Sequence, residues 1–324
     1  EVVVMNALTI NLHLLMASFY RPNGKRKKIL IEKNAFPSDR YAVQSQLKFH
    51  GNNPNEDLLI LQPKEGEHIL INDVISCLDK HGDEIALVLM GGVNYYTGQA
   101  FDMASITDKA QNCGCRIGFD LAHATGNIKM NLHEWGIDFA AWCGYKYLNG
   151  GPGAPSTVFI HERHLNKSDI PRFEGWWGHD KASRLKMPDD FNPLKTAEAW
   201  QISNPPILSM AALLSSLEIF HKVGMNELRQ KSIKLTSYLE VLLKSELQDN
   251  IEIITPLSDQ SRGCQLSIRL KSSKSNITED LREKGVICDW REPDVLRIAP
   301  VPLYNSFEDC HEFVQILKMV LNGS

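Results

Sequence analysis

Short apolar runs alternate with helix-like stretches through the first half of the chain. A run of about four to eight apolar residues between turn residues is typical of a buried strand, whereas apolar residues about three or four positions apart are typical of a helix. We therefore predict strands over residues 28–32, 58–61, 85–90, 116–119 and 139–143. The same reasoning predicts helices over 38–50, 72–81 and 102–112, and a first helix capped by Asn6. This alternation indicates βαβ units in a mostly parallel sheet.

The pattern changes at Asn204-Pro205-Pro206, where a proline pair interrupts the chain. Two long helical patterns follow, over 207–222 and 226–244. Shorter strands and helices are predicted beyond them, over 251–254, 264–270, 277–284, 286–290, 296–298 and 306–321. We therefore predict an α/β protein with a large domain over 1–205 and a small C-terminal α/β domain over 206–324.

The composition excludes few classes of function. Apolar residues make up 43% of the chain and charged residues 23%, which is ordinary for a globular protein. The net charge of -4 gives no general electrostatic reason to expect a nucleic acid or a membrane surface as a partner. Asn11 and His13 interrupt the apolar stretch near the start, so it is too short and too polar to predict a membrane span.

The cysteines and histidines show no metal-site or disulfide pattern. The seven cysteines are scattered without the spacing of a zinc or redox motif, which favours a reducing, cytoplasmic setting. His161 and His164 are close in the sequence, within His161-Glu162-Arg163-His164, but no zinc-protease spacing follows them. We therefore expect no metal site.

The strongest chemical signal is a carboxylate at the end of one predicted strand and a lysine just after another. Asp120 lies in Gly118-Phe119-Asp120-Leu121-Ala122-His123, and Lys146 follows 26 positions later (146 − 120) in Gly144-Tyr145-Lys146-Tyr147. The carboxyl ends of parallel strands face a common crevice in which ligands bind. There a carboxylate can keep a pyridine nitrogen protonated and a lysine can form a Schiff base, which suits pyridoxal 5'-phosphate (PLP).

Three further segments fit a cofactor that carries a phosphate. Thr9 lies in the first turn of the first predicted helix, where free N–H groups and the helix dipole favour a phosphate. Gly91-Gly92 ends a predicted buried strand and allows close backbone approach. Phe36-Pro37-Ser38-Asp39 offers an aromatic ring followed by a polar helix start. Each signal is weak alone, but their order along the chain and their placement at element ends make the set informative.

Seven segments of the sequence resemble those of kynureninases, which are PLP-dependent enzymes of fold type I, similar to class-V aminotransferases. They are Asn6-Ala7-Leu8-Thr9, Phe36-Pro37-Ser38-Asp39, Phe119-Asp120-Leu121-Ala122-His123, Tyr145-Lys146-Tyr147-Leu148-Asn149, Gly175-Trp176-Trp177-Gly178-His179, Ile202-Ser203-Asn204-Pro205-Pro206 and Arg297-Ile298-Ala299-Pro300-Val301-Pro302-Leu303-Tyr304. They span nearly the whole chain in family order. The resemblance therefore implies the fold-type-I PLP-dependent transferase fold.

The resemblance also implies a role for each matched position. Lys146 would carry the cofactor and move protons, Asp120 would pair with the pyridine nitrogen, and His123 would lie close to the ring. Tyr145 would contact the phosphate and act as a proton carrier in the cleavage step. The other cofactor-binding positions implied are Leu8, Thr9, Phe36, Pro37, Ser38, Asp39, Gly91, Trp176 and Asn204.

Substrate binding and assembly follow from the same resemblance. Arg297 would take the α-carboxylate of an amino-acid substrate, and Trp177 and Asn204 would contact the rest of it. Active sites in this family form at the interface of a homodimer, so Trp176 and Asn204 would reach the site from the partner subunit.

The reaction implied is the hydrolytic cleavage of L-kynurenine or 3-hydroxy-L-kynurenine to anthranilate or 3-hydroxyanthranilate, with release of L-alanine. This reaction belongs to tryptophan catabolism and NAD biosynthesis. The sequence gives no preference between the two substrates.

Two departures from the family pattern bear on activity. Gly91 stands where the family has a serine that contacts the phosphate, so a hydroxyl is lost, although a backbone N–H remains there as a donor. The missing hydroxyl would weaken PLP binding by about 1 kcal/mol. The family's N-terminal region, with a substrate-contacting histidine, is also absent, so Glu1 would already lie inside the large domain.

These departures keep one alternative open: a truncated, catalytically incompetent relative that acts only as a PLP-binding or dimerisation partner. Two other enzymes of the same fold also compete. A cysteine desulfurase needs a reactive cysteine on a late loop, but Cys264 and Cys288 fall in predicted strands. An aminotransferase would lack the paired tryptophans expected around an aromatic substrate.

Overall fold

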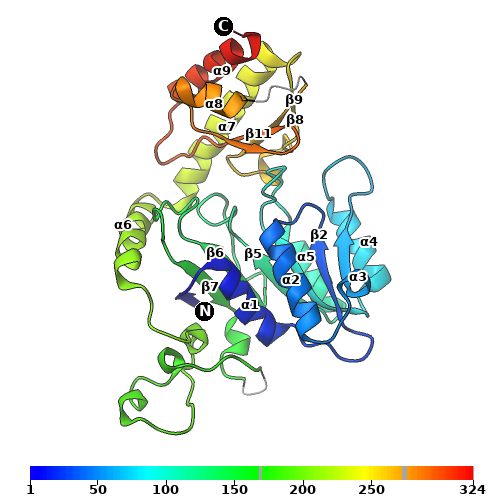
Figure 1. Cartoon of the computed structure of the whole chain (residues 1–324), viewed down its shortest axis with the longest axis vertical. Coiled ribbons are helices and arrows are strands. Elements are labelled where there is room, and N and C mark those ends of the chain that lie inside the picture. The colour runs from blue at the N-terminus through cyan, green and yellow to red at the C-terminus, as the bar shows by residue number, and fades with distance from the viewer. Residues whose placement is uncertain (168–169, 272–275, 324) are drawn as a thin grey trace. The chain divides into compact units, whose positions relative to one another are not determined.

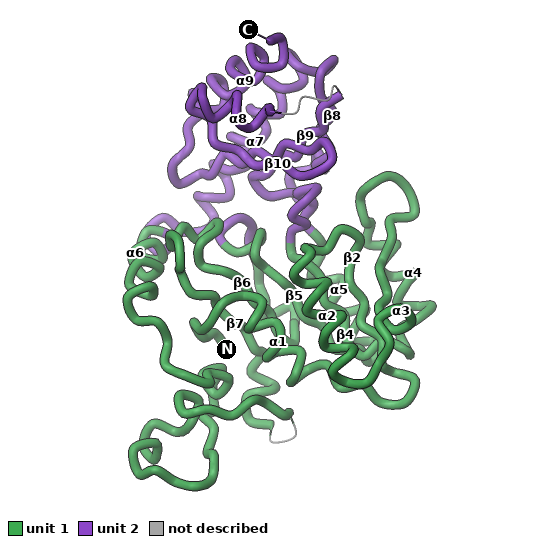
Figure 2. The backbone as a smooth tube through the Cα atoms, viewed as in Figure 1, with its two compact units in different colours: residues 1–92, 101–125, 130–219 green, residues 93–100, 126–129, 220–324 purple. Residues whose placement is uncertain are grey.

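The computed structural model describes residues 1–167, 170–271 and 276–323, and Figure 1 shows its helices and strands. The chain forms two compact units (Figure 2). Unit 1 comprises Glu1–Gly92, Phe101–Thr125 and Met130–Ile219. Unit 2 comprises Val93–Ala100, Gly126–Lys129 and Phe220–Ser324.

Unit 1 is built on a seven-stranded sheet with the order β1-β7-β6-β5-β4-β2-β3. Its strands are β1 (Val2–Val4), β2 (Lys28–Glu32), β3 (Leu58–Leu61), β4 (Ile85–Gly91), β5 (Arg116–Asp120), β6 (Phe139–Cys143) and β7 (Ser156–Ile160). β2 to β6 run parallel to one another, which confirms the mostly parallel sheet. β1 and β7 are antiparallel additions at one side, and the sequence pattern did not predict either strand.

The helices of unit 1 lie between the strands from β1 to β5, and one more, α6, follows β7. They are α1 (Leu8–Phe19), α2 (Pro37–Phe49), α3 (Pro54–Asp57), α4 (Ile71–His81), α5 (Met103–Asn112) and α6 (Ile207–Val223). Leu12, Leu15 and Val43 on α1 and α2 join one core with Ile29 and Ile31 of β2. This packing buries one face of the sheet and fixes the start of α1 and α2 beside the carboxyl ends of the strands.

A glycine in β5 is required by the packing of its neighbour. Gly118 lies opposite Phe139 of β6, and a Cβ on Gly118 would fall 2.1 Å from the Phe139 ring. The aromatic ring therefore fills the space that a side chain would take. This close approach brings β5 and β6, which carry the two predicted chemical groups, into tight register.

Unit 1 extends further along the chain than the sequence pattern predicts. The predicted boundary after residue 205 lies inside unit 1, which continues to Ile219. The first part of α6 packs on the loop after β6, because Leu213 lies against Gly144 and Gly150. Ser216 Oγ also donates a 2.5 Å hydrogen bond to the Leu148 carbonyl oxygen.

Unit 2 has a four-stranded antiparallel sheet in the order β10-β11-β9-β8, and its described residues include three α-helices. Its elements are α7 (Met225–Leu247), β8 (Ile251–Ile253), β9 (Leu266–Leu270), α8 (Ile277–Glu283), β10 (Asp289–Arg291), β11 (Val295–Ile298) and α9 (Phe307–Asn322). The strand predicted over 286–290 begins later, at Asp289, because only Asp289–Arg291 pair with β11. Leu235, Leu239 and Leu243 form a buried stripe on α7 at helical spacing and make the core of this unit.

Among the described residues, no single helix is long and apolar enough to cross a membrane. The successive helices α6 and α7 meet that criterion of length and composition only when they are combined.

A buried carboxylate ties three parts of unit 1 together. Asp138, directly before β6, is 1% exposed and accepts hydrogen bonds from the Ile117 backbone N–H (2.9 Å), Arg163 Nη2 (2.7 Å) and His164 Nε2 (2.7 Å). Burial alone would raise the pKa of Asp138, but the hydrogen bonds from His164 and Arg163 outweigh burial and hold the pKa below its usual value. The cluster therefore stabilises the fold only while Asp138 is ionised.

We expect the substitution Asp138→Asn to lower the free energy of unfolding by about 3 kcal/mol, because it leaves the half-buried Arg163 donor and the buried His164 donor without a charged acceptor. Urea unfolding at neutral pH measures this loss. Asp83→Asn, which removes the carboxylate of an exposed ion pair with Lys25, is the control and should change little. The Asp138 contribution is present above its unfolded pKa of about 3.8 and is lost as the pH falls below that value. Equal effects of the two substitutions would contradict this account.

Candidate active site

Four strands of the large sheet end at one edge and supply polar groups there. β2, β4, β5 and β6 run parallel as neighbours, so their carboxyl ends lie together. β2 ends in Glu32, β4 in Gly91 and β5 in Asp120, and the loop after β6 carries Lys146. Because α/β proteins bind ligands at the carboxyl ends of parallel strands, this edge is the candidate active site.

Lys146 lies among side chains that the sequence predicts around it. Its Nζ is 3.3 Å from His123 Nε2 and 5.6 Å from the centroid of the Phe36 ring. Its positive charge also lowers the pKa of the Asp39 and Asp120 carboxyls, against stronger effects that raise both. The structure thus brings together five predicted site residues from three separate segments of the chain.

Asp39 and Asp120 form a buried carboxyl pair. They are 8% and 7% exposed, and their side chains share a hydrogen bond. Burial raises the pKa of both groups, and the charge of Asp120 raises the pKa of Asp39 further. Two buried like charges in contact disfavour ionisation of both groups, so protonation of one member of the pair is favoured. Asp120 is also fixed by a 2.7 Å hydrogen bond from the Ala122 backbone N–H.

Glu32 is a third buried carboxyl at this edge, and it was not among the predicted site residues. It is 4% exposed, and burial raises the pKa of Glu32 to about 7, with the charge of Asp120 acting in the same direction. Its Oε1 accepts a hydrogen bond from the Gly91 N–H, while its Oε2 is buried and has no hydrogen-bond partner among the described residues. The signal available in the sequence was a charged residue at the end of the apolar run Lys28–Glu32.

The position of Gly91 changes one expectation. We expected its backbone N–H to replace the missing serine hydroxyl as a phosphate donor. The structure instead directs this N–H to Glu32 Oε1, at 3.1 Å, so it is already engaged. Gly91 is therefore part of the carboxyl cluster, as the partner of Asp120 in the β4–β5 register.

Two helix N-termini at the site offer donors for an anion. α1 begins at Leu8 after Ala7, whose side chain provides no cap, so the first N–H groups of the helix have no side-chain acceptor. Thr9 Oγ1 and Ser38 Oγ, from the first turns of α1 and α2, lie 2.8 Å apart. Pro37 opens α2 at its first position, where a missing N–H costs nothing.

The predicted cap of α1 was wrong. Asn6 adopts a left-handed φ of 48° and its amide donates to Asn11 Oδ1 at 3.0 Å, so it does not cap the helix. The physical reason is that Asn11, which is fully buried, needs this partner and the Met5 carbonyl oxygen. The consequence is that the helix start stays uncapped beside the site.

Tyr145 precedes Lys146 and is 50% exposed. Burial raises the pKa of Tyr145, and its hydroxyl shares a hydrogen bond with the Cys143 thiol, which raises it further. The phenol therefore stays protonated at neutral pH and can donate a hydrogen bond or a proton.

The tryptophan segment and Asn204 lie side by side in unit 1. Trp176 and Trp177 form a short 3-10 helix, Trp176–Gly178, after Gly175, whose Cα packs on the backbone of Ile202. Trp176 is 42% exposed and Asn204 is exposed as well. Trp177 stacks under Arg184, with the guanidinium carbon 4.5 Å from its ring. These residues do not join the Lys146 cluster through any contact that the structure describes.

Arg297 belongs to unit 2, on β11, and is held there by its neighbours. Its Nε lies 2.8 Å from Asp289 Oδ2, its Nη2 contacts the same oxygen, and its Nη1 donates to the Tyr95 carbonyl oxygen at 2.7 Å. The side chain is 12% exposed. A cavity of about 620 Å³ in unit 2 is lined by Arg297 and Asp289, together with Tyr304.

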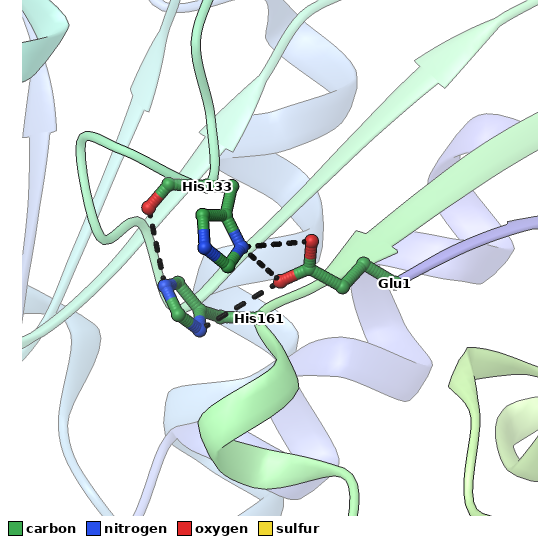
Figure 3. A group of neighbouring side chains, drawn as sticks. All are labelled: Glu1, His133 and His161. Carbon is green, nitrogen blue, oxygen red and sulfur yellow. Dashed lines mark hydrogen bonds and ion pairs between the residues drawn. The ribbon is translucent and has the colours of Figure 1, made fainter.

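A second polar cluster, outside this site, joins Glu1, His133 and His161 (Figure 3). Both Glu1 oxygens lie 3.0 Å from His133 Nδ1, and the two imidazole rings stack with centroids 4.9 Å apart. The ligand atoms of the three residues lie within 4.8 Å, so they could hold a metal ion. His161, however, already contacts the His133 carbonyl oxygen through Nε2 and the Arg163 N–H through Nδ1, each at 3.2 Å. We therefore assign the cluster to anchoring the start of β1.

Solved structures of other proteins share this fold. An apo cysteine desulfurase from Thermococcus onnurineus NA1 matches with a TM-score of 0.81 at 16% sequence identity, over 100% of this chain and 80% of that chain. A C-DES variant with glycine covalently linked to its PLP cofactor matches with a TM-score of 0.82 at 16% identity, over 98% of this chain and 80% of that one. The chain therefore has the fold-type-I fold of PLP-dependent enzymes.

Sequence comparison identifies the family within that fold. The model of the kynureninase C-terminal domain matches residues 228–317. The chain is 55% identical over 323 residues to a kynureninase of Koribacter versatilis, covering 99% of this chain and 76% of that protein. A kynureninase of Nematostella vectensis is 48% identical over 330 residues, covering 98% of this chain and 71% of that protein. The chain belongs to the kynureninase family.

The buried Glu32 predicts an unusual pH dependence of stability in the cofactor-free chain. Its unfolded pKa is about 4.5 and its folded pKa about 7, so the folded state holds an extra proton and loses stability as the pH rises through this window. The difference corresponds to about 3 kcal/mol. Between about pH 5 and about pH 8, we expect the free energy of unfolding of Glu32→Gln to rise by about 3 kcal/mol relative to that of the wild type. A constant cost of burying the amide would not change this pH-dependent difference.

Urea unfolding of both proteins across this pH range measures the effect. Glu84→Gln is the control: the hydrogen bond and the charge of Lys28 outweigh other effects and lower the pKa of Glu84, so its substitution should give no shift of this sign. A Glu32→Gln variant whose stability runs parallel to that of the wild type would contradict the assignment of a protonated Glu32.

Proposed function

We propose that the chain catalyses the PLP-dependent hydrolysis of L-kynurenine and 3-hydroxy-L-kynurenine to anthranilate and 3-hydroxyanthranilate, with release of L-alanine. This hydrolase reaction on a carbon–carbon bond belongs to tryptophan catabolism and NAD biosynthesis. The observation that carries the proposal is the Lys146 amine 3.3 Å from His123 Nε2, beside the buried Asp39–Asp120 pair, in a chain of the kynureninase family.

The residues at the sheet edge fit PLP as the cofactor. The buried Asp120 carboxyl suits a protonated ring nitrogen, because a buried carboxylate needs a cationic or hydrogen-bonding partner. The Phe36 ring, 5.6 Å from Lys146 Nζ, offers a face on which the cofactor ring can stack. The uncapped start of α1 at Leu8, with the Thr9 and Ser38 hydroxyls, suits the phosphate. When bound, PLP supplies an electron sink for the charge that develops at the substrate Cα.

We propose that the residues around the cofactor ring move the protons of the reaction. The Lys146 amine would take the proton from the substrate Cα, and His123 Nε2, 3.3 Å away, would hold the amine in place. The Asp39–Asp120 pair would keep the ring nitrogen charged. The Tyr145 hydroxyl, whose pKa is raised chiefly by burial, would donate its proton in the cleavage step.

Arg297 is proposed as the partner of the substrate α-carboxylate, because a guanidinium binds a carboxylate through two parallel hydrogen bonds. We further propose that Trp176, Trp177 and Asn204 serve the site of a second copy in a homodimer. The exposure of Trp176 and Asn204 in the single chain supports this assignment. All seven cysteines are free, which supports a cytoplasmic setting.

The cysteines also bear on the competing desulfurase activity. A desulfurase needs an accessible reactive thiol, yet every cysteine of this chain is buried or half-buried. We had predicted Cys264 and Cys288 within strands, but both lie just before the strands, Cys264 before β9 and Cys288 before β10. Cys264 is fully buried, and burial raises the pKa of Cys288 to about 11, so neither is a ready thiolate nucleophile.

The direct test is turnover of both substrates by the PLP-loaded chain, measured as release of anthranilate or 3-hydroxyanthranilate. We expect Lys146→Ala to abolish product and Tyr145→Phe to lower kcat by about 100-fold while PLP stays bound. Lys244→Ala, which removes an exposed lysine of an i,i+4 pair, is the control and should retain activity. A folded, PLP-loaded wild type without product would favour the alternative of a non-catalytic relative.

A further inference from the structure

An acidic residue opposite Arg297 is not accounted for by the proposed roles. Asp289 of β10 and Arg297 of β11 are directly paired in the antiparallel register. The Arg297 side chain is 12% exposed and that of Asp289 is 44% exposed. A cross-strand pair of this kind could be a plain structural ion pair, so the geometry of its hydrogen bonds decides what it can do.

Asp289 engages only one side of the Arg297 guanidinium. Nε and Nη2 both contact the single oxygen Oδ2, with Nε at 2.8 Å. Nη1 donates to the Tyr95 carbonyl oxygen at 2.7 Å. A guanidinium has five N–H groups, so two remain that the described residues do not engage, one on each terminal nitrogen. One N–H on each terminal nitrogen is the set of donors that a carboxylate bound end-on through two parallel bonds would use.

The surroundings hold the guanidinium in this orientation and leave a net positive charge. The Arg297 guanidinium carbon lies 5.7 Å from the centroid of the Tyr95 ring. Arg291 Nη2 also contacts Asp289 Oδ2, at 2.9 Å. Two guanidinium groups therefore share one carboxylate, which leaves one positive charge among the three side chains. Arg297 and Asp289 also line the cavity of about 620 Å³, a size typical of small-molecule sites.

We propose that Asp289 is a positioning residue that holds Arg297 ready for the α-carboxylate of the amino-acid substrate. This inference rests on the proposed function of Arg297. Asp289 fixes the guanidinium before the substrate arrives, so less side-chain freedom is lost on binding. Because Asp289 binds the side of the guanidinium that carries Nε, one N–H on each terminal nitrogen is left for the ligand.

The test compares Asp289→Asn with the wild type in the full PLP-loaded chain. We expect KM for L-kynurenine to rise about tenfold with kcat within about twofold, because binding and not chemistry is affected. Glu252→Gln is the matched control, since it removes a carboxylate from another arginine pair, with Arg269, in the same sheet. It should leave both constants unchanged, and thermal unfolding should show both variants folded.

A second readout does not depend on turnover. L-alanine and L-alaninamide, which differ in the carboxylate, are titrated against the PLP absorbance of each protein. The wild type should bind L-alanine more tightly, and Asp289→Asn should lose about tenfold of that preference and none of its affinity for the amide. A wild type that shows this preference without turnover would refute the proposed reaction but not this inference. No preference in the wild type, or tighter L-alanine binding by Asp289→Asn, would overturn the inference.

Discussion

The arrangement of the site depends on the cost of burying negative charge at the carboxyl edge of a parallel sheet. Glu32, Asp39 and Asp120 are almost fully buried, and Lys146 is the cationic side chain that acts on the Asp39–Asp120 pair. Burial raises the pKa of all three carboxyls, so ionising all of them beside one lysine is costly. A cofactor with a basic ring nitrogen meets this constraint, because the nitrogen can take up a proton and pair with Asp120.

Much of the fold could be predicted because buried parallel strands are continuous apolar runs. The predictions for β2, β3 and β6 match the structure, and β4 and β5 extend by one residue to reach Gly91 and Asp120. β1 and β7 were not predicted, because a three-residue strand and a strand after a glycine-rich loop carry little periodic signal. The unit boundary was misplaced for another reason: Pro205 and Pro206 interrupt the chain, but α6 beyond them still packs on unit 1 through Leu213.

The site was predictable only where it consists of family motifs. Asp39, Asp120, His123 and Lys146, which the resemblance assigns to one cofactor site, lie together in the structure, and their roles stay a prediction. Glu32 was not predicted because a charged residue at the end of a strand is normally expected to be exposed. The tertiary structure instead buries Glu32 against Gly91. Asp289 was missed because its role depends on a cross-strand register that the sequence does not specify. Long-range pairing, which decides both cases, has no signature in local periodicity.

The central claim is that Lys146 is the group that bonds the cofactor. The most direct measurement is to add PLP to the chain, reduce the adduct with borohydride and map the modified peptide by mass spectrometry. The account predicts one labelled lysine, Lys146, and greatly reduced labelling in Asp120→Asn. Labelling spread over exposed lysines such as Lys25 or Lys181, at the same level in the variant, would contradict it.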